Sequence, residues 1–157
     1  MTPEQISASN AKELALYKQE VSAAKDPKLH ILIVHLYIEH LLERYLTAQL
    51  KTTKRLFGKN GLGFEKKLLM IEAMGGFSPQ QIDSIRKLNA LRNDCAHQFK
   101  YQPSNAELEA FGRTLGKAYS AIKLKAGDDQ NKCMRSACAH LCGKLAKAVV
   151  TVEHAGA

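Results

Sequence analysis

The chain has 157 residues, of which 45% are hydrophobic and 24% charged, and these ordinary globular proportions exclude a disordered, collagen-like or fibrous protein. Its length predicts one domain spanning residues 1–157, and no apolar run approaches the roughly 18 residues of a membrane helix. The N-terminus lacks the regions of a signal peptide, so we expect a cytoplasmic protein with no membrane association. A net charge of +8 suits a polyanionic partner such as RNA, although many soluble domains carry a similar charge.

Two helices are predicted in the first third of the chain. The first covers residues 3–24, starts with a Thr-Pro cap and carries sparse apolar residues, so we expect it on the outside of the fold. An Asp-Pro pair supplies a similar start signal for a second helix over residues 27–51. Residues 31–38 are apolar round most of the helix circumference. The second helix is therefore predicted to be the central element.

Some polar residues of the second helix lie beside its apolar arc on the helical wheel, and others lie on its outer face. Glu39 lies at the edge of the apolar arc, so it is predicted to be a half-buried carboxylate in need of a cation. His35, one turn earlier, is predicted to be a core histidine satisfied by a hydrogen bond. Glu43 and Arg44 fall on the outer face. We expect both of them to be solvated.

The connector after the second helix, residues 51–63, is basic and rich in glycine. It is not a Walker loop, because no Gly-Lys-Ser/Thr follows. Its cations Lys54, Arg55 and Lys59 are candidates for contacting nucleic-acid phosphates, and the alternative is a solvated connector. A short third helix over residues 64–74 follows and is stopped by a Gly-Gly pair.

Three further helices are predicted in the second half of the chain. Ser78, followed by Pro and Gln, is a strong start signal for a fourth helix, which ends near His97. A capping box at residues 104–107 starts a fifth helix that runs to about residue 125, and a sixth covers residues 129–152. No credible strand pair is present in the sequence. The predicted class is all-α, an up-and-down bundle of four main helices with shorter additions.

Cysteine spacing bears on metal binding. The chain has four cysteines, at positions 95, 133, 138 and 142, and their spacing matches no familiar zinc pattern. We therefore predict that they pack a helix seam in a reducing compartment. No metal site and no cofactor is expected.

Arg92 is the residue of the fourth helix that most requires an explanation. On a helical wheel Ile82, Ile85, Leu88 and Ala96 form an apolar arc, and Arg92 points from the middle of it. A guanidinium facing a core must find an acceptor, because it cannot be neutralised at ordinary pH. Glu39 is the natural candidate, so we predict a Glu39–Arg92 ion pair between the second and fourth helices. Asn93 and His97 lie one turn apart on the flank beside this arc.

A family resemblance rests on the end of this helix. Residues 88–97 read Leu-Asn-Ala-Leu-Arg-Asn-Asp-Cys-Ala-His, which places an Arg, four intervening residues and a His at a helix end. This string resembles the signature of the HEPN superfamily, all-α domains of which many are metal-independent RNases. A long apolar helix with a lone Glu and a Phe-Glu-Lys-Lys-Leu turn extend the likeness over residues 29–101. They resemble the branch that contains the mannitol-operon repressor family, whose members need not be nucleases. The resemblance implies a homodimer in which two motif helices line one cleft.

Two functions follow as expectations. In a metal-independent endoribonuclease of toxin or defence type, with RNA as substrate and an antitoxin as partner, His97 would be the general base or acid. Arg92 would stabilise the charge of the transition state, and Asn93 would orient His97 or a phosphate oxygen. The alternative is a non-catalytic regulatory or interaction protein in which Arg92 and Glu39 form a structural pair. Many HEPN nucleases share a Tyr two residues beyond the His, and Phe99 at that position favours this alternative.

Overall fold

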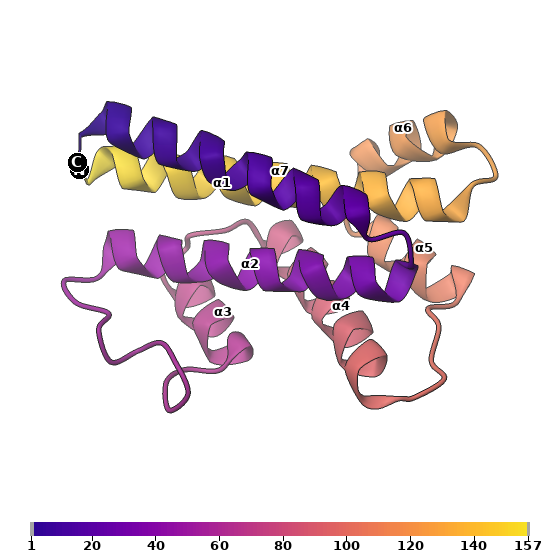
Figure 1. Ribbon diagram of the computed structural model, residues 1–157, viewed down its shortest axis with the longest axis horizontal. Coiled ribbons are helices and arrows are strands. Elements are labelled where there is room, and N and C mark those ends of the chain that lie inside the picture. The colour runs from indigo at the N-terminus through magenta and orange to yellow at the C-terminus, as the bar shows by residue number, and fades with distance from the viewer. Residues whose placement is uncertain (1, 157) are drawn as a thin grey trace.

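The computed structural model describes residues 2–156, and this part of the chain contains seven helices and no strand. The all-α prediction is therefore confirmed. Figure 1 shows the arrangement. The helices are α1 (Pro3–Ala23), α2 (Pro27–Gln49), α3 (Phe64–Ala73), α4 (Pro79–His97), α5 (Asn105–Arg113), α6 (Lys117–Ala126) and α7 (Gln130–Ala155).

Helix α2 is the central element, as its composition predicts. It packs against α1, α3, α4 and α7 (Figure 1). Its inward side chains are fully buried and include Ile31, Val34, Ile38, Leu41, Leu42 and Leu46. Each such side chain contributes about 1.5–3 kcal/mol when it leaves water, so α2 supplies much of the driving force for folding. Helix α1 buries only Ile6 and lies on the outside, which agrees with its sparse apolar pattern.

Local capping signals fix where the long helices begin. Ser78 and Gln81 form the reciprocal capping box of α4, with Pro79 at the first helical position. The side chain of Asp26 accepts the backbone N–H of Lys28 at the start of α2. These starts agree with the sequence prediction, because the interactions that define them are made within three residues.

The predicted fifth helix is broken in two, and this corrects the sequence analysis. The break lies between α5 and α6, where Gly116 adopts a positive φ of 64°. Gly112 is also required, since a Cβ there would lie 2.1 Å from the ring of Tyr119. The Tyr119 ring thus packs onto the α5 backbone, which a continuous helix would not allow.

All four cysteines are buried and unpaired in the core, as their predicted packing role requires. Among residues 2–156, no helix combines the length and apolarity needed to cross a bilayer.

Candidate functional site

The end of α4 carries the three residues of the predicted motif. Arg92 is half-buried, whereas Asn93 and His97 are exposed. The Nη1 atom of Arg92 donates a hydrogen bond to Oδ1 of Asn93 at 3.0 Å. His97 is the last residue of α4, where the helix dipole favours a cation. The fold therefore places these three side chains at one helix end, and we call them the Arg92 edge.

Arg92 does not point from the middle of the buried arc, which is a correction. The inward stripe of α4 continues from Leu88 through Leu91 and Cys95, which are 1–5% exposed, while Ala96 is exposed. At the end of α4 the buried positions are therefore Leu91 and Cys95, each one residue before Arg92 and Ala96, while Ile82, Ile85 and Leu88 are buried as predicted. Arg92 lies beside the core and reaches its rim.

The predicted Glu39–Arg92 ion pair is wrong. Glu39 instead accepts a hydrogen bond from Nζ of Lys67 at 2.8 Å, and Glu43 accepts one from the same atom at 2.6 Å. Lys67 is 3% exposed and its ammonium also lies 5.5 Å from the ring centre of Phe57. Burial lowers the pKa of Lys67, but the bonds to both carboxylates outweigh it and raise the pKa. The cation that pairs with Glu39 therefore comes from α3, which was predicted as a short helix beside the main bundle.

Behind the Arg92 edge, His35 makes a side-chain hydrogen bond between α2 and α4. Its Nε2 atom lies 2.9 Å from Oδ1 of Asn89, and its ring is 4.2 Å from that of Phe64. Burial lowers the pKa of His35, and the charge of Arg92 lowers it further, while Asn89 and Glu39 act in the opposite direction. The predicted hydrogen-bonded core histidine is thus present. The wheel did not identify Asn89 as its partner.

The basic connector lies away from this site. Lys54, Arg55 and Lys59 are exposed in the loop that follows the C-terminal end of α2. The end of α4 instead contacts the beginning of α2, where Nζ of Lys28 donates to the carbonyl of Gln98 at 3.3 Å. Because α2 has 23 residues, its two ends are roughly 34 Å apart. The connector then returns to Phe64, whose ring contacts that of His35, and among residues 2–156 no hydrogen bond or ion pair joins the connector cations to the Arg92 edge.

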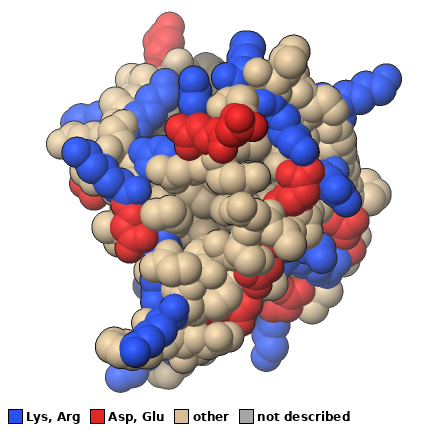
Figure 2. Space-filling view, turned by 90° about the vertical axis from the view of Figure 1, so that its right-hand side faces the viewer, with Lys and Arg blue, Asp and Glu red and all other residues tan. Residues whose placement is uncertain are grey.

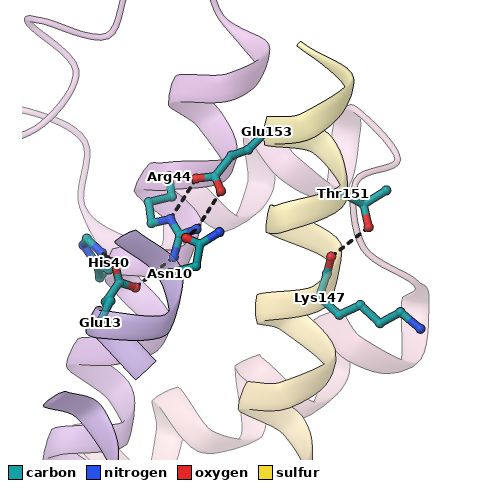
Figure 3. A network of polar contacts seen from close by, with 7 residues as sticks. All are labelled: Asn10, Glu13, His40, Arg44, Lys147, Thr151 and Glu153. Carbon is teal, nitrogen blue, oxygen red and sulfur yellow. Dashed lines mark hydrogen bonds and ion pairs between the residues drawn. The ribbon is translucent and has the colours of Figure 1, made fainter. Parts of the chain in front are cut away.

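Sequence reasoning missed a polar network at the C-terminal end of α2. Arg44, expected to be solvated, has a side chain only 15% exposed and lies between α1 and α7 (Figure 3). It donates to Glu153 at 2.8 and 2.6 Å, to Glu13 at 2.8 Å and to Asn10. We call this set, with His40 paired to Glu13 at 2.9 Å, the Arg44 clamp. One signal was available: Asn10 and Glu13 share a helix face with buried Ile6.

A cavity of about 570 Å³ opens beside the Arg44 clamp. Phe57, Thr47 and Ala48 contribute to its wall together with members of the clamp. The volume falls within the range of small-molecule sites. However, the charged groups that line it are already paired, Glu43 with Lys67 and the members of the clamp with one another, so the clamp serves to join three helices.

Surface charge at one end of the molecule is mixed. Figure 2 shows the end that lies at the right in Figure 1, with α5 and α6. Lys and Arg side chains surround a broad uncharged area, and Asp and Glu side chains are interspersed with them. The net charge of +8 is therefore not gathered into a single cationic stripe on this face. A nucleic-acid groove commonly presents such a stripe.

No protein-family model matches the sequence, and no curated protein matches it. A solved structure with the same fold is a chain of the X-ray structure of the MtlR–HPr complex from Escherichia coli. The two chains align with a TM-score of 0.65 and 14% identity, over 87% of this chain and 99% of the other. At this identity the likeness establishes the fold alone. The predicted resemblance to the mannitol repressor is thereby supported at the level of an all-helical architecture.

Proposed function

We propose that this protein is a regulatory protein that acts by binding another protein, and that it does not cleave RNA. The observation that carries the proposal is its fold, which matches a chain from a complex of MtlR with HPr over nearly the whole length of that chain. The Arg92–His97 spacing adds to this likeness. Together they support placing the chain in the mannitol-repressor-like branch of the HEPN superfamily.

The geometry of the Arg92 edge supports a non-catalytic role. A general base must be held in position by a neighbouring group, and Asn93 was the candidate to hold His97. In the structure Oδ1 of Asn93 accepts its hydrogen bond from Arg92 instead. Among residues 2–156 we find no hydrogen-bond partner for the His97 ring. The Asn93 oxygen is thus engaged by Arg92, and no hydrogen bond among the described residues positions His97.

The competing proposal is the metal-independent endoribonuclease of toxin or defence type. In its favour, Arg92, Asn93 and His97 lie within two turns at one accessible helix end. Cleavage would need a second set of groups to hold the RNA backbone. Lys54, Arg55 and Lys59 lie in the connector that follows α2, and among residues 2–156 no hydrogen bond or ion pair joins them to Arg92, Asn93 or His97. Their contact with phosphates, and an antitoxin partner, remain predictions.

Incubation of the purified protein with mixed RNA in excess chelator tests the choice between these functions. We expect no cleavage above that of a blank preparation. Cleavage that disappears in His97→Ala but persists in Lys87→Ala, an exposed cation on the same helix, would overturn the proposal.

Titration with purified HPr measures protein binding directly. We expect saturable binding with a Kd in the micromolar range, because transient regulatory contacts are commonly of that strength. Sedimentation of the protein alone tests the homodimer that the resemblance implies.

A further inference from the structure

The outward face of the first half of α2 is apolar. Leu29 and Leu36 are 47% and 62% exposed, and Leu32 and Ile33 between them are half-buried. Their spacing of three, four and seven residues places all four side chains on one face. We call this set the α2 apolar face. An exposed cluster of large aliphatic side chains on one face commonly marks an interaction site.

Cations border this face on the side of α4. Lys28 contacts the carbonyl of Gln98, and His35 contacts Asn89, so this flank of α2 adjoins the end of α4. Leu32 lies one turn from both Lys28 and His35, and therefore next to the Arg92 edge. Arg92 lies near enough for its charge to act on His35.

The border of the α2 apolar face is predominantly positive, and its cations form no ion pair with a carboxylate among the described residues. Within residues 2–156 neither Lys28 nor Arg92 is in an ion pair, whereas Arg44, Lys67 and Arg86 are each bound to two carboxylates. Three acids of this region are engaged otherwise, and of these Glu39 binds Lys67. Asp26 caps α2, and Asp94 accepts from the Gln98 side chain. Two further cations at this end, Lys25 and Lys100, are exposed.

These observations favour a protein partner over a second copy of the chain or RNA as the molecule that binds the α2 apolar face. An apolar centre with unanswered cations at its edge complements a surface with an apolar centre and carboxylates at its edge. A second copy fits poorly, because each chain carries a charge of +8 and would bring an equally cationic border. RNA gains little from four aliphatic side chains, which offer bases neither an aromatic ring nor a hydrogen-bonding group.

We propose that the α2 apolar face, together with the Arg92 edge, is the docking surface for a partner protein that presents an apolar patch bordered by Asp and Glu. The proposal rests on the protein-binding function proposed above and names where the partner binds. The residues of the sequence motif then have a binding role, in which Arg92 and Lys28 meet carboxylates of the partner. Phe99, which is 93% exposed just beyond α4, supplies an aromatic contact at the same edge.

A pair of fluorescent helical peptides tests this chemistry with the full-length protein. Both carry a leucine stripe, bordered by glutamates in one peptide and by lysines in the other. We expect the glutamate peptide to bind at least tenfold more tightly by fluorescence anisotropy. Leu36→Asp should weaken it at least tenfold, while Leu124→Asp, which alters a residue 86% exposed on α6, should leave it within twofold. Leu29→Asp is a second variant, and circular dichroism confirms that each variant is folded.

Charge reversal tests the border separately. Arg92→Glu should weaken the glutamate peptide about fivefold, and Lys87→Glu, on an exposed part of α4, should not. Equal binding of the two peptides, or equal losses in Leu36→Asp and Leu124→Asp, would overturn the docking surface. A dimer in sedimentation that dissociates in the Leu36→Asp variant would also overturn it. So would binding of a labelled RNA that is lost in Arg92→Glu and kept in Lys87→Glu.

Failure of this surface and failure of the proposed function give different results. If HPr or another purified protein binds and Leu36→Asp leaves its Kd unchanged, the docking surface is wrong and the protein-binding function stands. If the RNA assay shows cleavage that depends on His97, the proposed function itself is wrong.

Discussion

The two halves of α2 use their polar groups in opposite ways. In the C-terminal half, Glu39, His40, Glu43 and Arg44 each bind a charged partner on another helix. In the N-terminal half the outward side chains are leucines and isoleucine, and Arg92, at the adjoining end of α4, is hydrogen-bonded to the side-chain amide of its own neighbour. The polar groups of the C-terminal half are paired within the chain. The N-terminal half leaves apolar surface and positive charge available for binding a partner.

This difference separates structural cations from cations available for binding. A guanidinium that makes four hydrogen bonds, to two carboxylates and an amide, is held by a largely desolvated network, and its loss leaves charges uncompensated. A guanidinium with one neutral acceptor has most of its donors free, so its removal affects the fold little. Arg44 is of the first kind and Arg92 of the second, and measurements can break or sharpen this contrast.

The largest expected effect is that of Arg44→Ala. It leaves Glu13 and Glu153 without the guanidinium that they share, and removes the ion pairs that Arg44 makes from α2 to α1 and α7. We expect a loss of about 3 kcal/mol in the free energy of unfolding, measured by urea denaturation. Arg44→Lys, which keeps the charge but not the forked geometry, should lose about half as much. A loss below 1 kcal/mol in Arg44→Ala would remove the distinction between the two arginines.

The next largest effect is a loss of stability at low pH, which we attribute to His30. His30 is 1% exposed, and burial, aided by the charge of Arg135 and opposed by the backbone of Val21, lowers its pKa from 6.5 to about 4. Between these values the unfolded chain binds a proton that the folded chain does not, so stability falls as the pH falls. Linkage gives a loss of about 2 kcal/mol between pH 7 and pH 5.

Comparison of wild type with His30→Leu isolates this contribution. The difference in unfolding free energy between the two proteins should change by about 2 kcal/mol over that pH range, because the variant has no imidazole at this position. Parallel pH profiles would show that His30 titrates alike in the folded and unfolded chains.

A smaller effect concerns the partner of Glu39. Double-mutant cycles of Glu39→Gln with Lys67→Met should give a coupling energy of about 1 kcal/mol, since the two groups bind at 2.8 Å and the lysine is buried. The cycle with Arg92→Ala should give less than about 0.3 kcal/mol, because no bond joins that pair. A larger coupling energy for Glu39 with Arg92 than with Lys67 would instead support the Glu39–Arg92 pair that the sequence predicts.

The helix starts and the identity of the central helix were predictable because they depend on local signals. Ser78, Gln81 and the apolar run of residues 31–38 act within a few positions of themselves. The break between α5 and α6 was not predictable in this way. It depends on the Tyr119 ring packing onto Gly112 and on Thr114 accepting a bond from Ser84, both of which are tertiary contacts.

The candidate site was predictable in its residues and not in its contacts. Residue spacing placed Arg92, Asn93 and His97 at one helix end, where the structure has them. A wheel gives the direction of a side chain and does not say which helix it meets, so Lys67 on α3 was missed as the partner of Glu39. The Arg44 clamp was missed for a similar reason, since a polar outer face was taken for solvent-facing surface before α1 was placed on it.

The smallest expected effect on stability is that of Arg92→Ala. The guanidinium loses one hydrogen bond to an exposed amide and no ion pair, so the free energy of unfolding should fall by less than about 0.5 kcal/mol. Lys87→Ala on the same helix is the matched control, and urea denaturation measures both variants. A loss near that of Arg44→Ala would mean that Arg92 has a structural task. A negligible loss, combined with weaker binding of an acidic partner, would mean that the motif is retained for the contact it makes outside the chain.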